Sequence, residues 1–155
     1  MSTQVKTKEN TDPVAAMLNR VLASGLDFKL QVKQAHWNVR GANFAALHEL
    51  FDKLAADADE YADLIAERAV QLSGAAHGRL QDVSGHSSLP AYPQGIHEAL
   101  DHVKAVEAAI EKYVAQAKRG IDEAEDRDDT VTADILTEVA RGLDKWQWMV
   151  SAHRG

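Results

Sequence analysis

Apolar residues recur every three or four positions over most of the chain, which is the period of a helix packed along one side. We expect a first helix from Pro13 to about Val39, because Asp12-Pro13 is a typical helix start and Arg40-Gly41 a typical end. The helix carries two apolar stripes, made of Val14, Met17, Val21, Phe28, Val32 and Ala35, and of Leu18, Leu22, Leu26 and Leu30. Two stripes predict a helix that is covered on two sides.

A second long helix is predicted from a cap at Asn43 to about Ser73, with Gly74 as its stop. Its apolar positions alternate spacings of three and four, as in the seam of a helical bundle. They are Phe44, Leu47, Phe51, Leu54, Ala58, Tyr61, Ile65 and Leu72.

Residues 75–93 contain glycines and prolines that break any long helix, although a short helix fits within them. A third helix is predicted from about Gln94 to Glu125, and a fourth from about Thr130. Their core positions are Val103, Val106, Ile110, Tyr113, Ala117 and Ile121, then Ile135, Leu136, Val139, Leu143, Trp146, Met149 and Val150. The pattern predicts an all-α protein, a four-helix bundle with a long connection between the second and third helices.

Composition narrows the class of protein. A chain of 155 residues with 45% hydrophobic and 26% charged residues is typical of one globular domain, which we place at residues 12–155. Residues 1–11 are polar and aperiodic, so we interpret them as a mobile amino-terminal arm. The absence of cysteine excludes disulfides, thiolate metal sites and thiol catalysis. The sequence has no signal-peptide pattern and no long apolar run, so we expect a cytoplasmic protein without membrane contact.

Four side chains of metal-ligand type lie on one face of the second predicted helix. His48 and Asp52 are one turn apart, as are Asp63 and Glu67, and all four fall within an arc of about 100° that differs from the core stripe. The same face holds Ala45, Ala55, Ala56, Asp59 and Ala66. Small residues let another helix approach closely, so this face is predicted to meet a partner.

The two pairs are about 22 Å apart along one helix, so a single metal centre cannot use both. The four positions are symmetric about a point between Asp57 and Ala58. Two antiparallel copies crossing there would set each pair against the complementary pair of the other chain. The spacing therefore predicts two identical metal sites at a two-fold interface.

Isolated histidines and acid pairs on helices are more often surface residues than ligands. The pair His97 and Asp101 has the same spacing but no symmetric complement, so we expect it at the surface. The same expectation holds for His77, His86, His102 and His153. In the symmetric set, carboxylates with imidazoles favour iron, manganese or zinc over calcium or magnesium. The sequence has no Glu-x-x-His pair, so a di-iron site inside the bundle is not expected.

Several motifs resemble those of the Dps family, the mini-ferritins. They are Lys33 to Gly41 (KQAHWNVRG), Phe44, Leu47 to Asp52 (LHELFD), Asp63 to Arg68 (DLIAER), Asp134 to Leu136 (DIL) and Leu143 to Trp146 (LDKW). The resemblance covers nearly the whole chain outside the arm and residues 75–93. It implies a ferritin-like four-helix bundle with a short helix in the connection, assembled as a hollow homo-dodecamer.

The resemblance also implies the chemistry. The ferroxidase ligands of the family correspond to His36, His48 and Asp52 of one subunit with Asp63 and Glu67 of its two-fold mate, and Trp37 corresponds to an aromatic thought to donate electrons. Each site is expected to hold two irons, with zinc or another divalent metal as a substitute. The implied reaction oxidises Fe(II) to Fe(III), preferentially with hydrogen peroxide, and stores ferric mineral in the cavity.

Acids near the start of the fourth helix have two interpretations. The family places pore-lining acids in this region, which makes Asp126, Asp128, Asp129 and Asp134 candidates for the entry of iron. Acids at a helix amino terminus are, however, favourable in any protein. The sequence leaves both interpretations open.

Two other functions remain open at this stage. The arms could bind DNA and give a nucleoid-associated protein, since twelve weak arms act together. A net charge of −7, and only Lys6 and Lys8 in the arm beside Glu9 and Asp12, are thin support for it. Alternatively, the interface carboxylates are structural and hold zinc.

Overall fold

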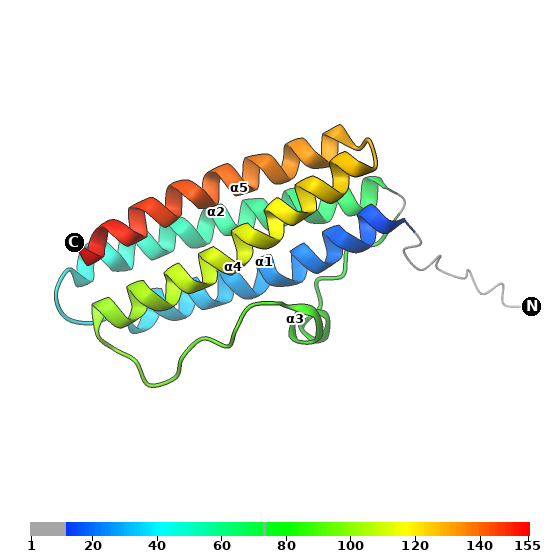
Figure 1. The fold of residues 1–155 in the computed structure, drawn as a ribbon. Helices are drawn as coiled ribbons and strands as arrows, with labels where there is room; N and C mark the ends of the chain where they lie inside the picture. The colour runs from blue at the N-terminus through cyan, green and yellow to red at the C-terminus, as the bar shows by residue number, and fades with distance from the viewer. Residues whose placement is uncertain (1–11, 73) are drawn as a thin grey trace, which may run out of the picture.

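The computed structural model describes residues 12–72 and 74–155, and within them the protein is all-α. Its helices are α1 (Pro13–Asn38), α2 (Phe44–Gln71), α3 (Leu80–His86), α4 (Ala99–Asp126) and α5 (Thr130–Ser151), followed by the 3-10 turn η1 (Ala152–Arg154). Figure 1 shows the four long helices side by side as a bundle, with the short α3 lying against α1. This confirms the four-helix bundle with a short helix in the second-to-third connection. The predicted arm, residues 1–11, and the predicted helix end at Ser73 lie outside the described residues.

The first helix begins and ends where the sequence predicts. The Asp12 carboxylate accepts hydrogen bonds from the backbone N–H of Val14 at 2.8 Å and of Ala15 at 3.4 Å, so it caps α1 as expected. Of the two apolar stripes, the first is buried throughout. In the second stripe Leu18 and Leu22 are buried, but Leu30 is 53% exposed, so one chain covers this side of α1 only in part.

At the start of α2, the predicted cap position of Asn43 is confirmed, whereas the predicted core position of Phe44 is wrong. Asn43 occupies the cap position, but it adopts the left-handed conformation with φ 63° and its side chain makes no capping hydrogen bond. The left-handed backbone is what the tight turn requires, and asparagine tolerates it. Phe44 is the first residue of α2, is 44% exposed and lies outside the core.

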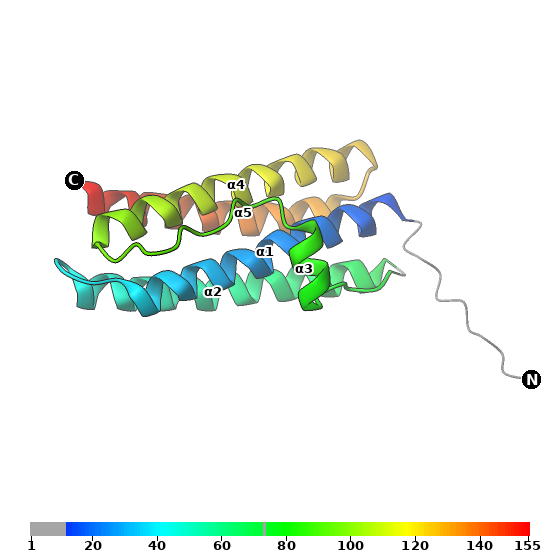
Figure 2. The same ribbon diagram turned by 90° about the horizontal axis from the view of Figure 1, so that it is seen from below.

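The third long helix starts at Ala99, five residues after the predicted start at Gln94. Gly95 has φ +74°, which interrupts a helix, and the backbone N–H of Arg40 donates to the carbonyl of His97 at 2.9 Å. The end of this segment is therefore tied to the end of α1, where Arg40 and Glu98 form an isolated parallel β-bridge. In Figure 2 the whole connection from α3 to α4 runs along the bundle over α1 and α4.

His102 is buried, so its predicted surface position is wrong. Its ring accepts a hydrogen bond from the Tyr92 hydroxyl at Nδ1 (2.5 Å) and donates from Nε2 to the carbonyl of Ile96 (3.0 Å). Through these two hydrogen bonds, His102 holds the segment between α3 and α4 against α4. The predictions for His77, His86, His97 and Asp101 are confirmed, because these residues are exposed, whereas His153 is half-buried.

Polar contacts join α2 to α5 at two levels. The Arg68 guanidinium donates to Thr132 Oγ1 and to Asp129 Oδ1, both at 3.0 Å. Near the middle of the bundle, Trp146 Nε1 donates to Asp57 Oδ2 at 2.8 Å. In the described part of the chain, no helix combines the length and the apolar character needed to cross a membrane.

Candidate metal centre

Two histidines from adjacent helices stack on each other. His36 lies in the last turns of α1 and His48 near the start of α2, with ring centroids 3.8 Å apart and an interplanar angle of 16°. Each ring bonds the backbone of the other residue: His36 Nδ1 lies 2.6 Å from the carbonyl of His48, and His48 Nδ1 lies 2.7 Å from the carbonyl of His36. Because a carbonyl only accepts, both Nδ1 atoms are the protonated donors.

The end of α1 permits the hydrogen bond from His48 to the carbonyl of His36. In a longer helix the carbonyl of His36 would accept from the backbone N–H of Arg40. Here that N–H turns to the carbonyl of His97, so the carbonyl of His36 is free to accept from His48. The two Nδ1–H donors leave both Nε2 atoms with lone pairs, which is the tautomer a metal ligand needs.

Asp52 joins the histidines on the same side of the two-helix hairpin. Its Oδ1 lies 3.9 Å from His36 Nε2 and accepts a hydrogen bond from Lys33 Nζ at 2.8 Å. The hydrogen bond and positive charge of Lys33 hold the pKa of the Asp52 carboxyl below its usual value. The structure thus brings together three of the five predicted ligands, and it shows an ammonium group on one of them.

Aromatic side chains border this group. Trp37 is 64% exposed, and Lys33 Nζ lies 5.8 Å from the centroid of its ring. Phe44 stacks on His48 with ring centroids 5.2 Å apart. The exposed Phe44 therefore belongs to the surroundings of the histidine pair.

The other two predicted ligands, Asp63 and Glu67, lie on the far half of α2 and are exposed. Fifteen residues separate Asp63 from His48 and Glu67 from Asp52, a distance of about 22 Å along the helix. Asp63 borders an open groove of about 290 Å³ whose lining also includes Asp59, Leu22 and Leu26. Among the described residues, no group of three or more His, Cys, Asp or Glu side chains is arranged to hold a metal ion within one chain.

The pore candidates lie in and beside the turn between α4 and α5. Asp126 is the last residue of α4, Asp128 has φ 57°, and both are exposed, as is Asp134. Asp129 caps α5: it accepts from the Thr132 backbone and hydroxyl and from Arg68. Burial raises the pKa of Asp129, but these hydrogen bonds and the Arg68 charge outweigh it and leave the pKa below its usual value. Its contacts at the start of α5 explain why an acid stands at position 129 without any role in a pore. A pore role for the four acids stays a prediction.

Sequence reasoning missed the part played by Lys33. It precedes His36 by three residues, and residues three apart share a helix face, so its position near the ligands could have been inferred. Its contact with Asp52 could not, because that contact depends on how α1 and α2 pack.

Comparison with known proteins agrees with the helical-bundle fold. The family model for a ferritin-like domain matches residues 15–155. The DNA protection during starvation protein of Agrobacterium fabrum is 45% identical over 143 residues, which is 90% of this chain and 86% of that protein. Among solved structures, Dps from Bacillus brevis has a TM-score of 0.86 at 32% identity, covering 92% of this chain and 95% of that one. Dps from Microbacterium arborescens in the high iron form has a TM-score of 0.84 at 37% identity, covering 94% and 97%.

The bundle, its short connecting helix and the family match define a ferritin-like protein. Within that class, the likeness in sequence and structure to these relatives is specific, and the chain belongs to the Dps family.

Proposed function

We propose that the protein is a ferroxidase and iron store that works as a hollow homo-dodecamer. Each site is formed by His36, His48 and Asp52 of one subunit with Asp63 and Glu67 of its two-fold mate. Fe(II) is the substrate, hydrogen peroxide the preferred oxidant, and the ferric product is kept as mineral in the cavity.

The reaction requires two metal ions at one site. Two Fe(II) ions each give up one electron, and hydrogen peroxide accepts both together with two protons. Its O–O bond breaks and two molecules of water form, so no hydroxyl radical is released. Carboxylates favour the more highly charged ferric ion, and the histidine Nε2 atoms fix the position of the metal.

The observation that carries this proposal is the reciprocal histidine pair. Two partly buried Nδ1–H bonds orient both rings in the metal-binding tautomer, and Asp52 Oδ1 lies 3.9 Å from His36 Nε2. In a surface histidine pair that binds no metal, we expect no such fixed orientation of the two rings. Asp63 and Glu67 lie at matching positions on the other half of the same helix, as a two-fold partner requires.

The direct test is oxidation of Fe(II) by peroxide, followed by the absorbance of the ferric product. The double variant His48→Ala with Asp52→Ala should oxidise Fe(II) at least about tenfold more slowly, since loss of support around a metal alone costs about 10- to 100-fold. A matched control is His97→Ala with Asp101→Ala, an exposed pair with the same sequence spacing, of which His97 lies just before α4 and Asp101 in its first turn. An unchanged rate of Fe(II) oxidation in the His48→Ala, Asp52→Ala variant would rule out these residues as ferroxidase ligands.

Sharing between subunits can be tested by mixing two inactive chains. One carries His48→Ala and Asp52→Ala, and the other carries Asp63→Ala and Glu67→Ala. In a two-fold pair made of one chain of each kind, one site keeps all five ligands and the other has lost four. Random reassembly of equal amounts should restore about a quarter of the sites, whereas ligands acting within one chain would give no recovery.

DNA binding is the second candidate function, and it is favoured by the name of the Agrobacterium fabrum relative, a DNA protection during starvation protein. A gel shift at low salt should be compared for the full chain and for a chain without residues 1–11. A shift only with the full chain would support binding through the arms, and no shift with either would exclude it. Metal analysis of the isolated protein tests the remaining alternative, a structural zinc at the interface.

A further inference from the structure

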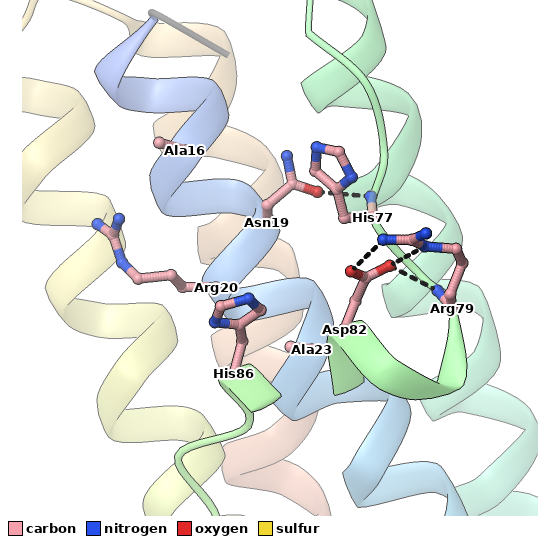
Figure 3. A pocket seen from close by; sticks show the side chains of 8 residues that line it. All are labelled: Ala16, Asn19, Arg20, Ala23, His77, Arg79, Asp82 and His86. Atoms are coloured by element: carbon pink, nitrogen blue, oxygen red, sulfur yellow. Dashed lines mark hydrogen bonds and ion pairs between the residues drawn. The ribbon is translucent and has the colours of Figure 1, made fainter. Parts of the chain in front are cut away.

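The segment between α3 and α4, residues 87–98, lies along α1, and we call it the strap. The chain before α3 is already held against α1, where Asn19 Oδ1 accepts from the backbone N–H of His77 at 2.8 Å (Figure 3). Farther along α1, the buried Gln31 donates from Nε2 to the carbonyl of Pro90 at 2.9 Å. The strap therefore follows a fixed course toward the carboxyl end of α1.

The last part of the strap is held by His102, a buried residue in the first turn of α4. Its Nε2 donates to the carbonyl of Ile96 at 3.0 Å, so its Nδ1 is free to accept from the Tyr92 hydroxyl at 2.5 Å. Burial lowers the pKa of His102, which keeps the ring in the neutral form that these two bonds require. Because Ile96 directly precedes His97, the ring fixes the backbone that meets α1.

The strap meets α1 where the helix ends. Residues 38–40 contain neither proline nor glycine, so their sequence alone does not stop the helix. The backbone N–H of Arg40 nevertheless donates to the carbonyl of His97 at 2.9 Å, and Val39 is extended, with ψ 139°. A helix that continued through Val39 would turn the same N–H onto the carbonyl of His36. The strap thus keeps α1 from continuing to Arg40.

The carbonyl of His36 is the acceptor that orients His48. His48 Nδ1 donates to it at 2.7 Å, which leaves Nε2 as the lone-pair nitrogen. The N–H of Arg40 on the same oxygen would compete with the ring, and a ring without that bond is free to carry its proton on Nε2. We propose that His102 is a positioning residue for the metal site: it holds the strap, the strap ends α1, and the end of α1 keeps His48 in its metal-binding orientation. This role rests on the proposed function for its effect on iron, whereas the orientation of His48 is a property of the metal-free protein.

His102→Leu removes both hydrogen bonds of the ring and tests the role in the metal-free, full-length protein. Solid-state NMR with isotopically labelled histidine nitrogens distinguishes Nδ1–H rings from Nε2–H rings, and His48→Ala identifies the signal of His48. In His102→Leu the Nδ1–H signal of His48 should fall and an Nε2–H signal should appear. A loss of stability alone would leave the His48 signal in place.

Titration with Zn(II) measures the consequence for the metal site. His102→Leu should bind Zn(II) about tenfold more weakly, since lost support around a metal ligand costs about 10- to 100-fold. Tyr92→Phe removes one hydroxyl, should give a smaller loss, and replaces His102→Leu in both measurements if that variant does not fold. His102→Gln keeps one donor and one acceptor and should retain most of the affinity. The control is Val139→Ala, which weakens the core on α5 without removing a strap hydrogen bond and should keep the affinity.

Either of two results would overturn the proposal. One is an unchanged Nδ1–H signal of His48 in His102→Leu. The other is a Zn(II) affinity in His102→Leu no lower than in Val139→Ala, which would leave no effect beyond general packing. If the unmodified protein neither binds Zn(II) nor oxidises Fe(II), the proposed function fails, and the NMR signal alone decides the role of His102.

Discussion

The stacked histidines illustrate how much of this protein depends on single polar atoms. The carbonyl of His36 can accept from His48 only because the N–H of Arg40 has a partner in His97. The orientation of a proposed ligand is thus linked to the chain before α4. Lys33 adds a second influence, since its ammonium group occupies an oxygen of Asp52 that a metal would need.

Replacing Lys33 by glutamine is predicted to strengthen metal binding. The change removes a positive charge and a hydrogen bond from Asp52, and both compete with a cation for the same oxygen. Zn(II) titration should give a several-fold higher affinity than in the unmodified protein. Lys53→Gln is the control, because Lys53 pairs with Glu49 on the same helix. Equal or lower affinity in the Lys33 variant would contradict the competition.

His102 is predicted to make stability depend on pH. Burial is the main cause that lowers its pKa in the folded protein, so the unfolded chain binds the proton more tightly. The contribution is complete above the unfolded value of about 6.5 and is lost as the pH falls through the folded value. Denaturant unfolding between pH 7.5 and 5 should show a smaller loss of stability in His102→Gln than in the unmodified protein. His97→Gln should keep the original dependence.

At the scale of elements, close helix packing rests on small residues facing aromatic ones. A Cβ at Gly142 of α5 would overlap the hydroxyl of Tyr61 on α2, and a Cβ at Gly25 of α1 would lie 2.6 Å from the hydroxyl of Tyr113. Burial, followed by the charge of Asp57, raises the pKa of Tyr61. The Gly142 contact sets how near α5 comes to α2, the helix that carries four of the proposed ligands, and the Gly25 contact sets how near α4 comes to α1.

Gly142→Ala is predicted to destabilise the fold by about 1–3 kcal/mol, because the added methyl group has no room. Gly85→Ala in α3 is the matched control: nothing lies within 4 Å of its added Cβ, and alanine favours helix by up to about 1 kcal/mol. The free energy of unfolding from urea titration measures both. A Gly142 variant as stable as the Gly85 variant would mean that α2 and α5 separate without cost.

At the scale of the whole molecule, one chain leaves large apolar side chains uncovered. Leu30 and Trp37 on α1, and Trp148 on α5, are 53%, 64% and 70% exposed. Exposed apolar groups of this size are typical of surfaces that another subunit covers. Ala55, which the sequence assigns to the partner face, is 3% exposed and packs in the core of its own chain. Ala56 and Asp59 are exposed, so they are the better positions at which to disturb the two-fold contact.

Ala56→Arg is predicted to give a folded chain that does not pair. A long charged side chain at an exposed small residue prevents close approach of a second helix but removes nothing from the core. Size-exclusion chromatography should move the protein from about twelve times 17.0 kDa toward the mass of one chain, with helical circular dichroism retained and peroxide-dependent oxidation lost. A monomer with full activity would contradict the shared site.

The sequence by itself determined the number and type of long helices, the start of α1, the short helix in the connection and the symmetry of His48, Asp52, Asp63 and Glu67. These features follow from local spacing and capping, which nearby residues specify. Tertiary structure decided the left-handed Asn43, the late start of α4, the burial of His102, and the contacts of Lys33 and His36. The conformation of Asn43 follows from the tight turn between α1 and α2. Each of the others depends on a carbonyl, a hydroxyl or a charge brought from a distant segment, which the periodicity of one helix does not encode.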